Sequence, residues 1–189
     1  MLVRTTYLEQ LSPADVRAAR LPLDLVEVVR VQRPAPEFAR FLYSTVGGDW
    51  YWLDRLGWSR EEWVAHLERP LTELWVAWVR GAPAGYFELC GSSCVDSLSI
   101  ELAYFGLLPG FLGVGLGGHL LTVALRSAWT LHSRWAGVAP VGRVWVHTCT
   151  LDGPAALANY EARGLVVYRT EEAEEELPDS PPGSWPART

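Results

Sequence analysis

The sequence contains no lysine: all 16 of its basic residues are arginine, and they are scattered along the chain rather than clustered. The absence of lysine excludes a lysine nucleophile, a Schiff base and a nucleotide-binding loop of the Gly-Lys-Ser/Thr type. Positive charge is also scarce, since the formal net charge is −6. No nucleic-acid partner is expected, because such a partner requires a basic stripe that displaces counterions from phosphates. Any phosphate ligand must therefore be bound by local groups.

Cysteine and long apolar runs are also scarce. The three cysteines, Cys90, Cys94 and Cys149, are odd in number, and no opening stretch combines the features of a secretion signal, which favours a reduced, cytoplasmic protein. No uninterrupted apolar run approaches the ~20 residues that cross a bilayer, so no membrane partner is expected. With 189 residues, of which 49% are hydrophobic and 20% charged, the chain is long enough for one compact α/β domain.

Hydrophobic periodicity divides the chain into strands and helices. Strands are predicted at residues 3–7, 26–31, 74–79, 85–90, 98–107, 144–149 and 165–169. Helices are predicted at residues 13–20, 36–47, 59–69, 116–134 and 154–164. The strands between residues 74 and 107 follow one another through short polar turns, which is typical of an antiparallel meander. Residues 1–170 are therefore expected to form a single domain, whereas residues 171–189 are acidic and Pro-rich and are expected to be poorly ordered.

A glycine-rich turn separates the longest predicted strand from the longest predicted helix. Residues 109–118 read Pro-Gly-Phe-Leu-Gly-Val-Gly-Leu-Gly-Gly. Glycines without Cβ atoms let a diphosphate approach unpaired backbone N–H groups, and the helix dipole adds partial positive charge at its start. A dinucleotide-binding fold would place this motif in the first unit of a parallel sheet, but the preceding strands read as antiparallel. A flexible or close-packed connection without a ligand is the alternative interpretation.

Between about residues 71 and 170, the order of these elements resembles the GNAT superfamily of acyl-CoA-dependent N-acyltransferases. The coenzyme motif of that superfamily reads Gln/Arg-x-x-Gly-x-Gly/Ala, and its positions fall on Leu112, Gly115 and Gly117. Both glycines match. Leu112 departs from the usual Gln or Arg, so the phosphate contact of that side chain is missing and the backbone donors remain.

A second GNAT signature lies near the end of the chain. Its Ala, Tyr and Gly, each four residues apart, are matched by Ala156, Tyr160 and Gly164. An Asn that often precedes the Ala by three residues is replaced by Gly153, with Asp152 as a candidate substitute. The resemblance implies an α/β (α+β) fold with a mixed, mostly antiparallel central sheet, a splayed pair of strands and flanking helices in a single domain.

The resemblance also implies acetyl-CoA as a cosubstrate, with no metal ion. The pantetheine arm would lie between the splayed strands at Phe105 and Leu107, and a backbone N–H near Phe105 would meet the oxyanion. Tyr160 would lie near the sulfur as general acid, since a phenol with a pKa of about 10 keeps its proton at neutral pH; a packed core aromatic is the alternative. The diphosphate would be bound by the turn residues Leu112, Gly113, Val114, Gly115, Leu116, Gly117 and Gly118.

The general base has three candidates. Glu101 lies in the long strand at a position where some GNAT proteins carry a catalytic base, and burial would raise its pKa. A solvent-facing glutamate on a half-buried strand is the alternative. Glu88 on the neighbouring strand is the competing carboxylate, and His147 is the third candidate because imidazole titrates near neutrality.

Aromatic residues concentrate where the GNAT fold places its acceptor-binding helices. Trp50, Tyr51 and Trp52 predict an aromatic-lined pocket for an apolar or cationic acceptor, with Glu88, His147 or Asp49 as polar contacts. Tryptophan packing in the core is the alternative, and it is the favoured interpretation for two others, Trp58 and Trp63.

The leading hypothesis is an enzyme that transfers an acetyl group from acetyl-CoA to a primary amine, small-molecule or peptide, by direct attack in a ternary complex. A covalent acyl-enzyme on Cys149 is disfavoured, because the neighbouring strand residues are apolar and offer nothing to form a thiolate. The rival hypotheses are a degenerate GNAT domain that binds acyl-CoA as a sensor or scaffold, and a binding module whose glycine turn is only structural. The Trp-rich composition is compatible with a homodimer.

Overall fold

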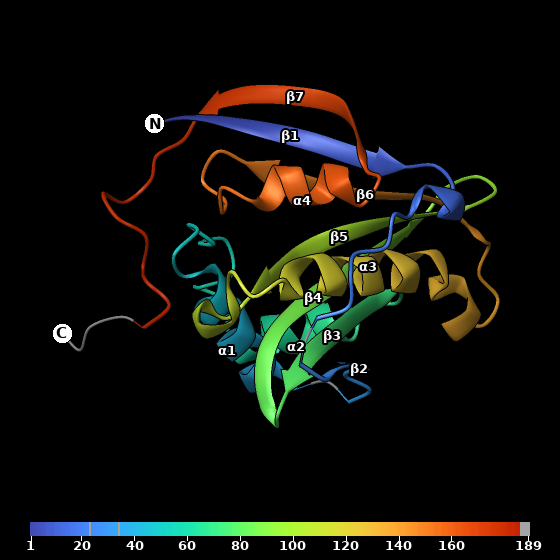
Figure 1. The fold of residues 1–189 in the computed structure, drawn as a ribbon, viewed down its shortest axis with the longest axis horizontal. Coiled ribbons are helices and arrows are strands. Elements are labelled where there is room, and N and C mark those ends of the chain that lie inside the picture. Colours follow the sequence, from blue (N-terminus) through green and yellow to red (C-terminus); the bar gives the residue numbers. More distant parts are fainter. Residues whose placement is uncertain (23, 34, 186–189) are drawn as a thin grey trace.

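The computed structural model of the chain describes residues 1–22, 24–33 and 35–185. Seven strands of this described part form one mixed sheet in the order β2-β3-β4-β5-β6-β1-β7 (Figure 1). In chain order they are β1 (Leu2–Gln10), β2 (Val26–Arg30), β3 (Thr72–Val79), β4 (Ala82–Ser93), β5 (Leu98–Leu107), β6 (Val141–Cys149) and β7 (Val166–Glu174). Neighbouring strands are antiparallel except β5 and β6, which are parallel.

Helices connect the strands, and local sequence explains where two of them begin. The α-helices are α1 (Pro36–Gly47), α2 (Arg60–Leu67), α3 (Leu116–Trp129) and α4 (Ala156–Ala162), and the short 3-10 helices are η1 (Pro13–Asp15), η2 (Pro109–Phe111) and η3 (Leu131–Arg134). The side chains of Ser59 and Glu62 each accept a hydrogen bond from the other residue's backbone N–H, and this reciprocal capping starts α2. Gly115 starts α3 without a side-chain cap, in the left-handed conformation that favours glycine.

The helices lie on both faces of the sheet and give the fold three layers. α3 packs on one face, where its Leu121 lies in a core with Phe87 of β4 and Ile100 of β5. α1 and α2 pack on the opposite face around Tyr43 and Trp63. Successive side chains of a strand point to opposite faces of the sheet. The strands β3, β4 and β5 therefore each contribute residues to the core under α3 and to the core under α1 and α2.

The parallel pair β5 and β6 separates partway along its length. Pairing covers Leu98 to Glu101 of β5 and Val141 to Trp145 of β6. Beyond Glu101, β5 stays paired with β4, whereas β6 stays paired with β1. The two strands therefore splay, as predicted, and the mixed sheet with flanking helices confirms the expected fold class.

The N-terminal strand lies at the opposite end of the sheet from the meander. β1 is inserted between β6 and β7 and is antiparallel to both (Figure 1). The predicted helix at residues 13–20 is reduced to the single turn η1. The place of β1 was not predicted, because strand pairing across more than a hundred residues leaves no local signal.

The C-terminal boundary also differs from the prediction. β7 continues to Glu174, so the boundary expected after residue 170 is too early. The segment after β7 runs toward the end of α1, down the left side of Figure 1. There the N–H of Gly183 donates to the carbonyl of Gly48 at 2.9 Å, and the N–H of Ser184 donates to Asp49 Oδ1 at 3.0 Å. Residues 186–189 of the predicted tail lie outside the described residues.

Candidate active site

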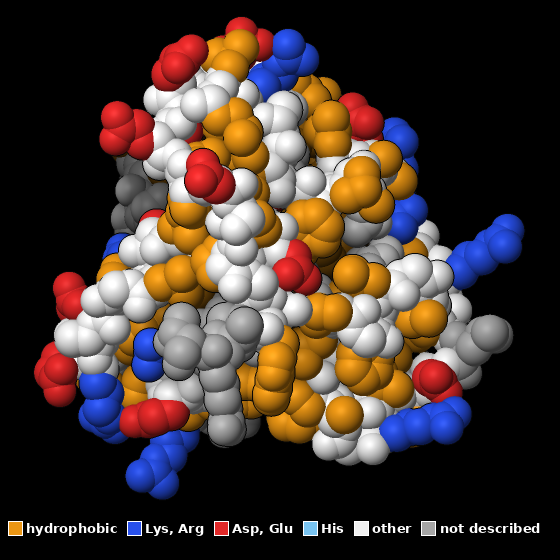
Figure 2. Space-filling model, turned by 90° about the vertical axis from the view of Figure 1, so that its left-hand side faces the viewer, with side chains coloured by type: hydrophobic (Ala, Val, Ile, Leu, Met, Phe, Trp, Pro, Cys, Tyr) orange, Lys and Arg blue, Asp and Glu red, His pale blue; other side chains and the backbone are white. Residues whose placement is uncertain are grey.

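A cavity of about 1110 Å³ opens between the splayed strands. It is lined by the glycine turn, by the unpaired end of β5, by the loop after α1 and by the loop from β6 into α4. The face shown in Figure 2, which is the left-hand side of Figure 1, carries many hydrophobic side chains, with acidic side chains above them toward β1 and β7. Of the residues predicted for a site, the cavity wall includes Trp50, Trp52, Glu101, Phe105, Leu107, Leu112, Gly113, Gly117, Gly118, His147 and Tyr160.

The glycine turn presents bare backbone at the start of α3. Gly113 and Gly115 have φ angles of +78° and +82°, and a Cβ added at either residue would meet no atom within 4 Å. The first N–H groups of α3 have no intrahelical partner and no side-chain cap. The turn therefore offers donors and open space where an anion would bind. Three predicted residues of the turn do not line the cavity: Leu116, which is buried in the core, Val114, which is exposed, and Gly115.

Tyr160 of α4 lines the cavity. Its ring contacts that of Phe105 on β5 edge to face, with centroids 6.1 Å apart. Only 6% of Tyr160 is exposed, and burial together with the nearby Asp152 raises the pKa of its hydroxyl above the usual range. The phenol consequently keeps its proton at neutral pH and can donate it into the cavity.

Glu101 and His147 form a pair across the start of the splay. His147 Nδ1 lies 3.4 Å from Glu101 Oε1, and both residues line the cavity. The hydrogen bond that the His147 ring donates to Glu101 raises the pKa of His147, against the opposing effect of burial. Two residues that the sequence suggested as separate candidates are thus brought together: an imidazole that can accept a proton and a carboxylate that orients it.

Glu88 is the centre of a buried polar network beneath the cavity wall. Its two oxygens accept hydrogen bonds from Arg55 Nη1 and Nη2 at 3.0 and 2.9 Å, and Oε1 also lies 2.9 Å from His66 Nε2. Burial would raise the pKa of Glu88, but these partners outweigh it and the pKa is lowered. Glu88 is 2% exposed and does not line the cavity. It is therefore better placed to hold Arg55 than to contact an acceptor.

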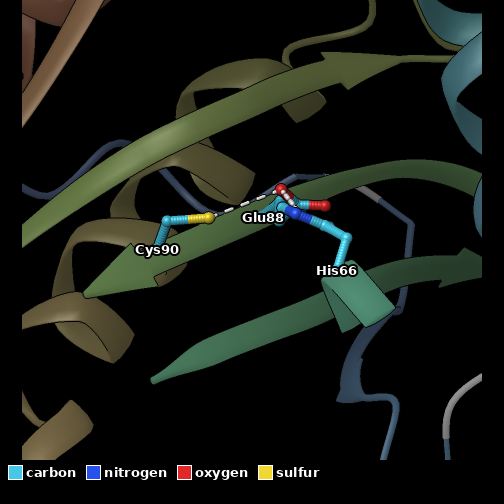
Figure 3. Close-up of side chains that lie close together, drawn as sticks. All are labelled: His66, Glu88 and Cys90. Carbon is cyan, nitrogen blue, oxygen red and sulfur yellow. Dashed lines mark hydrogen bonds and ion pairs between the residues drawn. The ribbon is translucent and has the colours of Figure 1, made fainter. Parts of the chain in front are cut away.

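The same network contains donor atoms that a metal ion could use. His66 Nε2, a Glu88 oxygen and Cys90 Sγ lie within 4.8 Å of one another (Figure 3), a donor set that Zn²⁺ accepts. However, Arg55 already occupies both oxygens of Glu88, and a metal cation would lie beside its guanidinium. Burial also raises the pKa of the Cys90 thiol, which disfavours the thiolate that a metal requires. The geometry fits a proton between His66 and Glu88 better than it fits a metal ion.

Arg55 also fixes the aromatic wall of the cavity. Its guanidinium lies over the rings of Tyr104 and Trp58, at 4.3 and 4.7 Å from their centroids. Asp54, the neighbouring residue, accepts short hydrogen bonds from the hydroxyls of Tyr43 and Tyr104. Asp54 is exposed and lines the cavity, so it occupies the place of the carboxylate that was expected at Asp49.

The predicted tryptophans divide between the cavity wall and the core. Trp50 lines the cavity and lies 3.5 Å from the Cβ position of Gly153, on the opposite loop. Trp52 packs against the ring of Tyr104, with centroids 4.8 Å apart, and also lines the cavity. Trp63 is 2% exposed and packs in the core between α1 and α2, with Trp58 against it.

Cys149 lies on the cavity wall without a group that would activate it. Burial and the carboxylate of Asp152 both raise the pKa of its thiol. Asp152 accepts hydrogen bonds from the Thr148 hydroxyl and the Cys149 N–H, which fixes the loop before α4. A nucleophilic thiolate is therefore disfavoured at this position.

Sequence reasoning missed several polar residues of the site. Asp54, Arg55, His66, Arg69 and Asn159 line the cavity, and none of them belongs to a motif. One hint of their place in the site was present in the sequence: Asp54 and Arg55 lie between Trp52 and Trp58, just after the segment predicted to line the pocket. Their roles depend on contacts with β4 and β5, which are distant in the sequence.

Comparison with known proteins identifies the fold. No family model and no curated protein sequence matches the chain. Among solved structures, a GCN5-related N-acetyltransferase from Kribbella flavida matches with a TM-score of 0.58 and 17% identity, over 88% of this chain and 55% of its own. Another GCN5-related N-acetyltransferase, from Sphaerobacter thermophilus, matches with a TM-score of 0.56 and 15% identity, over 89% of this chain and 50% of its own. The chain thus spans only about half the length of these two proteins.

An aminoglycoside acetyltransferase from an uncultured soil metagenomic sample, in complex with sisomicin, also matches. Its TM-score is 0.57 at 11% identity, over 73% of this chain and 87% of its own. The chain therefore has the fold of the GCN5-related N-acetyltransferases, the GNAT superfamily that its glycine turn and its α4 signature indicated. Among the described residues, no helix has the length and apolar character needed to cross a membrane.

Proposed function

We propose that this protein transfers an acetyl group from acetyl-CoA to a primary amine by direct attack in a ternary complex. One observation carries the proposal: a single cavity joins the glycine turn to Tyr160 and to the pair Glu101–His147. An anion site, a proton donor and a proton acceptor thus face one space.

The fit to coenzyme A rests on the bare backbone at Gly113 and Gly115, where a side chain would fill the cradle. Acetyl-CoA would supply an acetyl group activated as a thioester. The N–H groups at the start of α3 would bind its diphosphate. Beyond Glu101, the edge of β5 that faces β6 has no strand partner, so its backbone N–H groups are available to the pantetheine arm and to a carbonyl oxygen as it gains negative charge.

Each proton has an assigned group. His147, oriented by Glu101, takes the proton from the acceptor ammonium, directly or through water. Tyr160 gives its proton to the departing sulfur. Cys149 takes no part, since nothing around it stabilises a thiolate.

The wall of the cavity favours a cationic acceptor. The carboxylates of Asp54, Glu101 and Asp152 line it together with the rings of Trp50 and Trp52, whose faces attract cations. Two arginines also line the cavity, but Arg55 is paired with Glu88, so Arg69 is the opposing charge. The matching enzyme in complex with sisomicin, an acetyltransferase of aminoglycosides, supports the same acceptor class. We therefore infer a small molecule with more than one amino group.

The test is a panel of amines incubated with acetyl-CoA and the purified protein, read by release of free thiol and by the mass of the product. Polyamines and amino sugars are expected to gain 42 Da per acetyl group, as the replacement of hydrogen by acetyl requires, while neutral aromatic amines react more slowly. Thiol release without an acetylated product, or acetylation of no amine, would refute the proposal.

A coenzyme-binding domain without turnover is the second candidate. Leu112 and Gly153, which replace the polar residues of the GNAT motifs, are the observations that favour it. Tyr160→Phe separates the two: an enzyme should lose about 10²- to 10⁴-fold in turnover while it binds coenzyme A unchanged. Equal turnover of the variant and the wild type would remove Tyr160 as the proton donor.

A further inference from the structure

Arg163, the residue after α4, lies against the first turn of α3. A Cβ added to Gly118 would lie 2.7 Å from Arg163 Nη1, so the guanidinium rests on bare glycine backbone. The contact lies beside the cavity wall, to which Gly118 and Asn159 belong. Asn159, one turn before Arg163, also faces this point, with Oδ1 3.6 Å from the same Cβ position.

The backbone of Arg163 is held in place. Its carbonyl accepts hydrogen bonds from Gln10 Nε2 at 3.0 Å and from the Arg17 N–H at 3.1 Å. Ala19, two residues after Arg17, lies 3.1 Å from the Cβ position of Gly118. The N-terminal segment thus packs α4 and α3 together and leaves the Arg163 side chain little choice of direction.

The Arg163 guanidinium has no charged partner in the part of the chain that the structure describes. Its Nε is buried without a hydrogen-bond partner, and Arg163 takes part in none of the ion pairs found among the described residues. The N-terminus of α3 carries partial positive charge and unpaired N–H donors. Two groups of the same sign, both with free donors, converge here, so an anion between them would be stabilised by both.

We propose that Arg163 binds the diphosphate of the coenzyme together with the backbone N–H groups of α3, and so replaces the side chain that Leu112 does not provide. The assignment rests on the proposed function for the identity of the anion. The binding of a phosphate group by a guanidinium together with a helix N-terminus does not itself depend on acetyl transfer.

The test compares the binding of three ligands to the wild type and to Arg163→Met, which keeps the packing of the stem and removes the charge. Calorimetry would measure coenzyme A, pyrophosphate and pantetheine, of which pantetheine has no phosphate. Arg126→Met, which removes an exposed arginine on the last turn of α3, is the matched control. Arg163→Lys tests whether charge alone suffices.

Arg163→Met is expected to weaken coenzyme A and pyrophosphate by about 10- to 100-fold, the range of one charge-assisted contact. Pantetheine affinity should not change, the salt dependence of coenzyme binding should decrease, and Arg126→Met should behave as wild type. Equal coenzyme affinity of Arg163→Met and the wild type, or an equal loss for pantetheine, would overturn the inference. A wild type that binds pyrophosphate through Arg163 but not coenzyme A would refute the proposed function alone. Binding of neither ligand would refute both.

Discussion

The contact of His147 with Glu101 supports the role of base that we propose for His147. An isolated strand histidine is most often structural, but this one lines a cavity with a carboxylate 3.4 Å from its Nδ1. The carboxylate favours the protonated imidazole and raises the pKa of His147. A base must be neutral to accept a proton, so turnover should rise as the pH rises through this raised pKa.

Glu101→Gln tests the pair. The amide no longer stabilises the imidazolium, so the pKa of His147 falls and the rising limb of the kcat/KM profile should move to lower pH. The plateau should also fall, because a less basic imidazole accepts protons less well, but by less than the about 10²- to 10⁴-fold expected for His147→Gln. Profiles measured from pH 5 to 9 would decide; an unmoved limb in Glu101→Gln would show that His147 is not the titrating base.

Glu73 shows a carboxylate whose role is stability rather than catalysis. It is 3% exposed, lies outside the lining of the large cavity, and accepts hydrogen bonds from Arg30, Arg134, Trp75 and Trp135. Burial would raise the pKa of Glu73, but the hydrogen bonds from Arg134 and Trp75 lower it. Its stabilisation is therefore present above the unfolded-state pKa and is lost as the pH falls through the lowered folded-state value.

Glu73→Gln should lower the free energy of unfolding by about 3 kcal/mol at neutral pH, because the paired arginines lose their counter-charge. Glu37→Gln is the control, since Glu37 forms an exposed pair with Arg60 and such pairs contribute at most about 1 kcal/mol. Urea unfolding at pH 7 measures both. Similar midpoints for the two variants would contradict this account of the Glu73 network.

At the scale of the elements, the glycine turn and α3 act as one unit. The turn needs the left-handed conformation at Gly113 and Gly115, and the open space beside them is where an anion would lie. Local sequence predicted this element well, because its signal is confined to ten consecutive residues.

Gly115→Asp should abolish coenzyme binding, since it adds a negative charge and bulk at the start of α3. Gly137→Asp controls for backbone strain alone. Gly137 has a φ of +76° and a Cβ there would also meet no atom within 4 Å, but it lies between η3 and β6 rather than at the start of α3. Calorimetric titration with coenzyme A checks both variants. Retained affinity in Gly115→Asp, or an equal loss in Gly137→Asp, would contradict the assignment of the turn.

The arrangement of the strands was predictable only in part. The meander from β3 to β5 links neighbours in the sequence, and alternating hydrophobic residues mark its strands. β1 pairs with β6 and β7, more than 130 residues away, so no local pattern reveals its place between them. The extension of β7 to Glu174 was missed for the same reason: an acidic segment reads as a tail unless its partner strand is known.

At the scale of the whole molecule, the segment after β7 connects the β7 edge of the sheet to the loop after α1. It leaves β7, which pairs with β1, and forms hydrogen bonds with Gly48 and Asp49, next to Trp50 of the cavity wall. A Cβ at Gly48 would collide with the backbone of Gly183, so the two chains are in close contact. The segment thus holds the loop that carries the acceptor side of the cavity.

Deletion of residues 176–189 should therefore raise the KM for the acceptor amine about 5- to 30-fold, as expected for two lost hydrogen bonds of about 1 kcal/mol each. The affinity for coenzyme A should not change, because the two hydrogen bonds reach Gly48 and Asp49 and not the glycine turn. Steady-state kinetics and coenzyme titration measure the two effects. An unchanged KM, or a loss of coenzyme affinity, would contradict this role of the segment.

In the candidate site, too, residues within one short motif were predictable, whereas contacts between distant segments were not. Motifs predicted the turn and Tyr160, because their spacing lies within one element. The sequence named Glu101, Glu88 and His147 as rivals but could not decide among them, since only folding shows that Glu88 is held by Arg55 and that Glu101 faces His147. Arg163 was missed because its contact with Gly118 joins two helices.

The most direct test of the account is a crystal structure of the protein with coenzyme A. We predict the diphosphate at the N–H groups of residues 113–118 with Arg163 in contact, and the sulfur near the hydroxyl of Tyr160, on the same side as Glu101 and His147. A coenzyme bound elsewhere, or a thiol end turned away from Tyr160 and His147, would contradict the central claim that one cavity holds the anion site and both proton-transfer groups.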